Sequence, residues 1–297
     1  MHTRRDFICK SSLAAAGVLL HSSLLANSDQ KYKMGLQLFT IRDAMAKNVA
    51  ETLKQIAAMG YQDTETYGFD PSTVSYYGYK AKDFLQLLKQ NEFITTSGHY
   101  DLFKYLNVPQ QDLLAYVDKC IEGAHILQQK YITWPWLDPA DRNMDKFKLL
   151  ATKLNLIGER ITKSGLGFAY HNHDFEFVDY NGTNGYEVIM NETDPKFVKL
   201  QVDLYWVSKA APISPAELFR KQPGRFVMWH IKDMDKVTKD YTEMGNGSID
   251  YTKILPDAKL SGLQYYYIEQ GGNFKKNSME SVQESANFFN KNLKHLL

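Results

Sequence analysis

A strand followed by a helix repeats along this chain, and the number of repeats constrains its fold more than any other feature. Eight short apolar runs predict strands: Met34 to Thr40, Gln62 to Tyr67, Phe93 to His99, Tyr131 to Trp136, Leu166 to His171, Val198 to Leu204, Phe226 to Lys232 and Gln264 to Glu269. Helical patterns lie between or after them, at Val49 to Met59, Lys82 to Asn91, Leu113 to Gln128, Asp145 to Lys163, Pro215 to Lys221 and Met279 to Leu296. Eight alternating units predict an α/β fold built as a single closed (β/α)8 barrel, because open doubly wound sheets normally use fewer strands.

Glycines support this division of the chain. Gly60, Gly165, Gly224 and Gly262 each separate a helical pattern from the next strand, where the end of a helix favours a left-handed residue. The segment after the first strand, L-F-T-I-R-D, contains no glycine-rich phosphate loop, which disfavours a dinucleotide-binding fold. No Pro-rich linker divides residues 28–297, so we expect them to form one domain.

Residues 1–27 have the pattern of an export signal and are left out of the barrel. The paired Arg4 and Arg5 precede Phe7 and an apolar run from Leu13 to Leu20, followed by small and polar residues, a pattern typical of twin-arginine signals. The apolar run is shorter than the roughly 20 residues that a membrane span needs. We therefore expect no membrane span and a periplasmic mature protein; a frayed amphipathic helix is the alternative.

The charge balance bears on possible partners. The chain has 35 Lys plus Arg against 34 Asp plus Glu, a net charge of +1, which provides no field to attract nucleic acid. The two cysteines, Cys9 and Cys120, do not form a disulfide framework or a zinc-binding pattern. We expect a small-molecule partner and no nucleic acid; an oligomer is compatible with the sequence.

Polar and indole-bearing residues gather where the predicted strands end, and in a barrel these ends form a cup. Burying several carboxylates and imidazoles among apolar strands is costly without a cation, so the set favours a metal centre over isolated structural residues. Mn²⁺, Mg²⁺ or Co²⁺ suit oxygen-rich ligation with one imidazole, and Zn²⁺ remains compatible. The strand-end residues are Glu65, His99, Trp134, Trp136, His171, His173, Asp203, His230, Lys232 and Glu269.

Three motifs carry a resemblance to a known family: V-D-L-Y-W around Asp203, H-I-K-D around His230 and I-E-Q around Glu269. With them, residues 28–297 resemble the xylose isomerase-like TIM barrel superfamily, in the branch of sugar phosphate isomerases and epimerases related to inosose dehydratase and 3-keto-glycoside lyases. The resemblance implies a divalent metal bound by an acidic residue of strand five, an aspartate of strand six, a histidine of strand seven and a glutamate of strand eight. Asp203, His230 and Glu269 match the last three.

The strand-five ligand departs from this pattern. Where relatives read E-N-H, this chain reads His171-Asn172-His173. Either His171 replaces the carboxylate or Glu176 reaches back from the following loop. Glu176 is preferred, because a shell of carboxylates with one imidazole suits a hard cation.

Such a shell supports chemistry next to a carbonyl. A cation that polarises the carbonyl of a keto-sugar makes the neighbouring C–H acidic, so an enediolate is the expected intermediate. His173 and Glu65 are the candidate acid–base groups. Lys232 lies two residues beyond His230, on the same strand face, and could stabilise the oxyanion; an ion pair with Asp233 or Glu269 is the structural alternative.

Aromatic residues at the strand ends indicate the substrate. His99, His171, Trp134 and Trp136 are candidate substrate-binding residues, with the two tryptophans forming pocket wall, whereas Phe39 is expected in the core. Residues Met244 to Asp250, M-G-N-G-S-I-D, predict a flexible loop. A sugar isomerase or epimerase acting on a neutral keto-sugar is the expected function. A 3-keto-glycoside lyase and a noncatalytic sugar-binding barrel are the alternatives, and the charge balance argues against an apurinic endonuclease.

Overall fold

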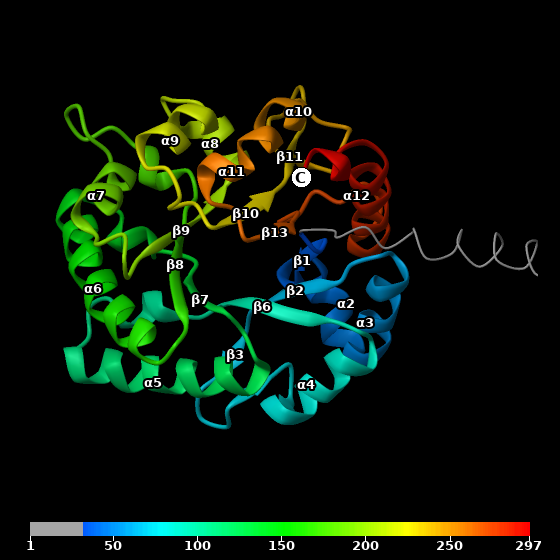
Figure 1. Ribbon diagram of the computed structural model, residues 1–297, viewed down its shortest axis with the longest axis horizontal. Helices are drawn as coiled ribbons and strands as arrows, with labels where there is room; N and C mark the ends of the chain where they lie inside the picture. The colour runs from blue at the N-terminus through cyan, green and yellow to red at the C-terminus, as the bar shows by residue number, and fades with distance from the viewer. Residues whose placement is uncertain (1–31) are drawn as a thin grey trace, which may run out of the picture. The chain divides into compact units, whose positions relative to one another are not determined.

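Eight parallel strands close into a barrel in the computed structural model, which describes residues 32–297 (Figure 1). The predicted export segment lies outside the described residues. Around the barrel the order is β1-β13-β10-β9-β8-β7-β6-β2, so β1 closes the ring by pairing with both β2 and β13. The strands are β1 (Gly35–Gln37), β2 (Asp63–Thr66), β6 (Ile94–His99), β7 (Tyr131–Trp134), β8 (Gly167–His171), β9 (Lys199–Asp203), β10 (Met228–Ile231) and β13 (Tyr265–Ile268). Each lies within a predicted run, which confirms the (β/α)8 barrel.

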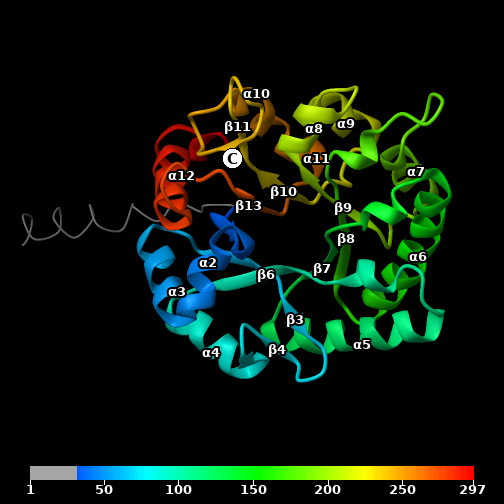
Figure 2. The same cartoon turned by 180° about the vertical axis from the view of Figure 1, so that it is seen from behind.

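Helices cover the outside of the barrel, as seen from both faces (Figures 1 and 2). Those that the sequence predicts are α3 (Val49–Ala58), α4 (Ala81–Gln90), α5 (Gln110–Leu127), α6 (Met144–Lys163), α9 (Pro215–Lys221) and α12 (Ser278–Asn292). The side chains of Asn48, Asn143 and Asn277 cap α3, α6 and α12 by accepting a backbone N–H of the first turn. Gly60, Gly165, Gly224 and Gly262 have φ values of +93°, +87°, +76° and +83°, as the helix-end prediction requires.

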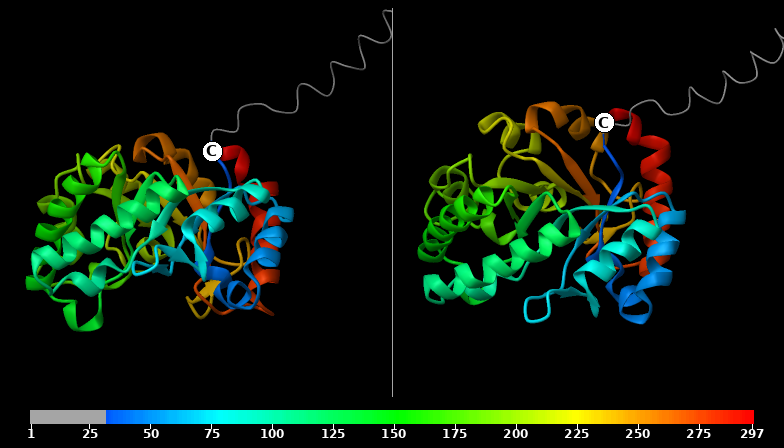
Figure 3. Two further views of the ribbon diagram at one scale, coloured as in Figure 1. Left: turned by 90° about the horizontal axis from the view of Figure 1, so that it is seen from below. Right: turned by 60° about the horizontal axis from the view of Figure 1, so that its bottom comes forward.

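Further elements lie in the connections. They are α2 (Arg42–Lys47), α7 (Gly185–Glu192), α8 (Leu204–Ala210), α10 (Tyr251–Ile254) and α11 (Ala258–Ser261), with a small sheet of β3 (Phe69–Asp70), β4 (Ser75–Tyr76) and β5 (Tyr79–Lys80). After β10, β11 (Asp233–Met234) pairs with β12 (Tyr241–Thr242) in an antiparallel ladder. Two further views show the strands passing between the outer helices (Figure 3).

Apolar side chains fill part of the barrel interior. Tyr131, Ala169, Met228 and Tyr267 are buried in one cluster, with Tyr265 packed against it. Side chains alternate along a strand, so the residues two positions beyond Met228 and Tyr267 also face inward. These residues are His230 and Glu269, which places them above the apolar layer, toward the carboxyl ends of the strands.

The opposite end of the interior holds a buried carboxyl group. Asp63 lies at the start of β2 and accepts a hydrogen bond from the backbone N–H of Thr96 at 3.0 Å and another from its hydroxyl. Burial outweighs these bonds and raises the pKa of Asp63 to about 8. Asp63 is thus a structural group of the barrel floor, two residues before Glu65 on the same face.

Candidate metal centre

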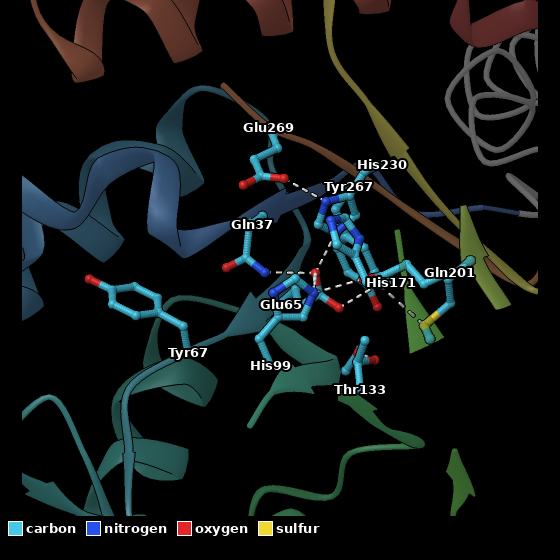
Figure 4. Close-up of polar contacts among 12 residues, drawn as sticks. Gln37, Glu65, Tyr67, His99, Thr133, His171, Gln201, His230, Tyr267 and Glu269 are labelled. Carbon is cyan, nitrogen blue, oxygen red and sulfur yellow. Dashed lines mark hydrogen bonds and ion pairs between the residues drawn. The ribbon is translucent and has the colours of Figure 1, made fainter. Parts of the chain in front are cut away.

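Strand register brings the predicted polar residues together at one end of the barrel. Glu65 pairs with Gln37, His171 pairs with Gln201, and Asp203 pairs with His230. In a parallel sheet paired residues point to the same side, so these side chains converge on the barrel axis. Figure 4 shows several of them pointing toward one another from different strands, with Tyr67 set apart from the cluster.

His230 is the centre of this cluster. Its Nδ1 lies 2.5 Å from Glu269 Oε2, and its Nε2 lies 2.5 Å from Glu65 Oε2 (Figure 4). The ring is fully buried. Burial alone would lower the pKa of His230, but the two carboxylates outweigh it and raise the pKa to about 9.

Glu65 is surrounded by hydrogen-bond donors. Nε2 of Gln37 donates to its Oε2 at 2.7 Å, Nε2 of Gln201 donates to its Oε1 at 2.6 Å, and Nε2 of His99 lies 3.2 Å from Oε2. Burial would raise its pKa, but His99 and His230 outweigh burial and hold the pKa of Glu65 well below its usual range. A fully buried carboxylate with this set of donors has no oxygen free for a substrate proton, which argues against the predicted acid–base role of Glu65.

Asp203 and Glu269 lie on either side of a lysine ammonium group. Lys232 Nζ is 2.7 Å from Asp203 Oδ2 and 2.8 Å from Glu269 Oε2. The other oxygen of Asp203, Oδ1, accepts the backbone N–H groups of Tyr205 and Trp206 at the start of α8, which fixes the orientation of the carboxylate. One ion pair predicted for Lys232, that with Glu269, is present, but Asp203 takes the place of Asp233.

Two groups of side chains in residues 32–297 offer ligand atoms within 4.8 Å of one another. One is Asp203, His230 and Glu269, and the other is His99, His171 and His230. The first group fits a hard divalent cation, because it supplies two carboxylates and one imidazole. Lys232 Nζ lies between its two carboxylates, where a positive charge is stabilised.

Glu176, the preferred strand-five ligand, belongs to neither group. Its Oε1 accepts the hydroxyl of Tyr170 at 2.7 Å, and its Oε2 accepts the backbone N–H of His173 at 2.8 Å. Burial raises the pKa of Glu176 to about 8 despite these bonds. Both oxygens are thus engaged behind the strand end, and His171, whose Nε2 is 3.7 Å from Asp203 Oδ2, is nearer to the predicted ligands.

His171 and His173 lie above His230, with ring centroids of His171 at 4.5 Å from His230 and 4.9 Å from His173. Burial, together with neighbouring positive groups, lowers the pKa of both rings well below the usual range. His173 is half-buried. A neutral imidazole that reaches the mouth of the barrel can accept a proton.

Partly exposed aromatic rings surround His173. Trp136 lies edge-on to it at 4.8 Å, Trp206 lies at 5.8 Å, and Tyr241 lies at 5.9 Å from Trp206. Trp134 is fully buried and donates its indole N–H to the carbonyl of Trp136, which argues against its predicted place in the pocket wall. Trp136 keeps a place at the mouth.

Comparisons with known proteins identify the family of this chain. The model of the xylose isomerase-like TIM barrel family matches residues 53–292. The chain belongs to this family. No curated protein matched the chain.

Solved structures share the fold at low sequence identity. A sugar phosphate isomerase/epimerase from Parabacteroides distasonis is 24% identical, with 91% of this chain and 96% of that chain covered and a TM-score of 0.78. A xylose isomerase-like TIM barrel protein from Mycobacterium smegmatis in complex with magnesium is 15% identical, with 90% and 98% covered and a TM-score of 0.67. The IOLI protein with a bound zinc atom is 15% identical, with 89% and 99% covered and a TM-score of 0.68.

Two site residues of this family member were missed from the sequence. Gln37 and Gln201 both contact Glu65, and Gln201 Oε1 also lies 2.7 Å from His99 Nε2. The signal for Gln201 was its position two residues before Asp203, which puts both on the inner face of β9. Phe39, expected in the core, is instead 40% exposed at the end of β1.

The loop of residues 244–250 is tied to the barrel rather than free. The carboxylate of Asp233 accepts the backbone N–H groups of Gly245, Gly247 and Ile249 at 2.9, 3.1 and 3.2 Å. A Cβ at Gly247 would come within 2.0 Å of Asp233 Oδ1, so only glycine fits. The prediction of a flexible loop is wrong, because three backbone N–H groups of the loop donate hydrogen bonds to the carboxylate of Asp233.

None of the helices in residues 32–297 has the combination of length and apolar character that crossing a membrane requires. Cys120 is a buried free thiol within the same residues. Burial raises its pKa well above the usual range, so it is a core residue without a place in the site chemistry.

Proposed function

We propose that the protein is a divalent-metal-dependent sugar isomerase or epimerase that acts on a keto-sugar through an enediolate. One observation carries the proposal: Asp203, His230 and Glu269, from adjacent barrel strands, place their ligand atoms within 4.8 Å of one another. Structures of similar fold that contain magnesium or zinc support a cation here. Mn²⁺, Mg²⁺ or Co²⁺ fits the carboxylate-rich set best, and Zn²⁺ is compatible with it.

A divalent cation at these ligands would act as a Lewis acid that polarises a substrate carbonyl. The side chains of the chain supply the remaining steps. His173 accepts the proton from the carbon next to the carbonyl, and the C–H electron pair forms the C=C bond of the enediolate. Lys232 donates a hydrogen bond to the oxygen that gains negative charge. Return of the proton to the other carbon, with the hydroxyl proton passing to the former carbonyl oxygen, gives an isomer. Return of the proton to the other face of the same carbon gives an epimer.

The mouth of the barrel favours a neutral sugar. Trp136, Trp206 and Tyr241 are partly exposed next to His173. Flat aromatic rings pack well against the C–H faces of a sugar ring. We therefore propose a keto-sugar or keto-glycoside as the substrate class.

Exchange of substrate hydrogen with solvent tests the proposal. The purified protein, loaded with Mn²⁺ and incubated in D₂O with a panel of keto-sugars and 3-keto-glycosides, should incorporate deuterium next to the carbonyl. His173→Ala should lose exchange by roughly 10² to 10⁴-fold, the usual contribution of a positioned acid–base group. His125→Ala, on the exposed surface of α5, is the matched control and should retain full exchange.

The outcomes separate the alternatives. Release of the aglycone from a 3-keto-glycoside would assign the reaction to the lyase alternative with the same first step. Sugar binding without exchange would favour a noncatalytic barrel and overturn the proposal. Full exchange in His173→Ala would show that His173 is not the base.

We also propose that residues 1–27 direct export to the periplasm through a twin-arginine route. The support is the sequence Thr3-Arg4-Arg5-Asp6-Phe7 ahead of the apolar run. Replacing Arg4 and Arg5 by Lys should leave the protein in the cytoplasm, as fractionation of expressing cells would show. Unchanged export of the double variant would contradict the twin-arginine route.

A further inference from the structure

The two ring nitrogens of His230 face different neighbours. Nδ1 faces Glu269 and lies on the side of the Asp203, His230 and Glu269 group. Nε2 faces Glu65, whose Oε2 also lies 3.2 Å from His99 Nε2. His230 belongs to both ligand groups, so the nitrogen that carries the proton decides which group can take a cation.

Glu65 is held rigidly against Nε2. Gln37 from β1 and Gln201 from β9 donate to its two oxygens at 2.7 and 2.6 Å, and the carboxylate is fully buried. Gln37 lies on β1, which is next to β2, and Gln201 lies on β9, across the barrel from β2, so the carboxylate is held between them and cannot swing toward a substrate at the mouth. The imidazole nitrogen that lies 2.5 Å from the Glu65 carboxylate is Nε2 of His230.

We propose that Glu65 is a positioning residue that accepts the Nε2–H of His230 and thereby presents Nδ1 to the divalent cation, together with Asp203 and Glu269. Metal-bound histidines generally donate their second ring N–H to a carboxylate or carbonyl, which fixes the tautomer and the ring orientation. This arrangement excludes Nε2 as a ligand atom, and with it a site formed by His99, His171 and Nε2 of His230. The inference rests on the proposed metal-dependent function.

The tautomer of His230 gives a direct test that needs no variant. Long-range ¹H–¹⁵N spectra of the ¹⁵N-histidine-labelled, Zn²⁺-loaded protein should show His230 protonated at Nε2 and coordinated through Nδ1. Coordination through Nε2, with the proton on Nδ1, would overturn the inference while leaving a metal-binding protein. Failure of the wild-type protein to bind Zn²⁺ or Mn²⁺ would overturn the proposed function itself.

Substitution of Glu65 gives a second readout. In Glu65→Gln an amide takes the place of the carboxylate among the donors Gln37 and Gln201. Mn²⁺ affinity measured by titration calorimetry should fall by about 10- to 100-fold, the usual effect of losing such a partner. Glu65→Asp keeps the charge and should restore part of the affinity.

The matched control is Glu243→Gln. Glu243 is another buried carboxylate, and it accepts hydrogen bonds from Ser281 at 2.6 Å and the backbone of Lys275 at 3.0 Å. This variant should lose stability without losing Mn²⁺ affinity. Equal Mn²⁺ affinity in Glu65→Gln and the wild type would show that Glu65 does not position His230.

Discussion

Removing the ammonium group of Lys232 should tighten metal binding while it weakens the metal-free fold. Lys232 Nζ lies 2.7 and 2.8 Å from Asp203 and Glu269, and all three side chains are at least nine-tenths buried. In Lys232→Met the two carboxylates lose their positive partner. Breaking a buried ion pair from one side typically costs about 3–5 kcal/mol, so the free energy of unfolding without metal should fall by that amount.

The same substitution removes a competitor for the cation. In the wild type a divalent cation must displace the ammonium from the two carboxylates, whereas in Lys232→Met it meets them unpaired. An affinity gain of about 10- to 100-fold, or about 1.4–2.8 kcal/mol, is expected. Urea unfolding with and without MnCl₂ measures the stability, and titration calorimetry measures the affinity.

The control is Lys163→Met, which removes an exposed lysine that lies 2.7 Å from Glu159 on α6. An exposed pair contributes about 1 kcal/mol or less, so neither stability nor Mn²⁺ affinity should change much. Equal or weaker Mn²⁺ binding by Lys232→Met would refute the competition, and would mean that Lys232 and the cation share the carboxylates.

Two further predictions concern the barrel away from the site. Burial raises the pKa of Asp63 to about 8, above its unfolded value near 4, so the unfolding free energy of the wild type should fall as the pH rises from about 4 to 8, by up to about 1.4 kcal/mol per pH unit. Asp63→Asn should flatten this pH dependence in urea titrations, and an unchanged slope would contradict the prediction. Asp233→Ala should lower the free energy of unfolding by roughly 2–4 kcal/mol and raise the rate of amide hydrogen exchange at residues 244–249. The control is Asp235→Ala, which removes a carboxylate that accepts hydrogen bonds from its own turn at residues 237–238 and should leave that exchange unchanged.

The barrel could be predicted because each strand is an apolar run bounded by turn residues and each unit repeats the same pattern. The helices that were missed show the limit of that signal. α7 is short, and α8 begins at Leu204, directly after Asp203, which is the last residue of β9 and caps the helix with its side chain. Because the same residue ends the strand and caps the helix, no turn residues mark the boundary between β9 and α8 in the sequence.

Three of the predicted metal ligands, Asp203, His230 and Glu269, came together because inward-facing residues at the ends of neighbouring parallel strands converge, whereas Glu176 follows its strand in a loop. The fate of the two tryptophans could not be predicted in this way. Trp134 and Trp136 are two residues apart and would share a face in a strand, but β7 ends at Trp134, so the first indole is fully buried while the second turns toward the mouth. Likewise, only the three-dimensional register places Lys232 next to Asp203 of the neighbouring strand.

Anomalous diffraction from crystals soaked in MnCl₂ would locate the cation and its ligands in one experiment. One strong manganese peak is expected, bonded to Asp203, to Nδ1 of His230 and to Glu269, at distances of about 2.0–2.3 Å, with the Lys232 ammonium displaced. A fully occupied peak at His99, His171 and Nε2 of His230 would contradict the assignment of the ligands. Absence of any peak in the barrel at saturating Mn²⁺ would contradict the metal centre itself.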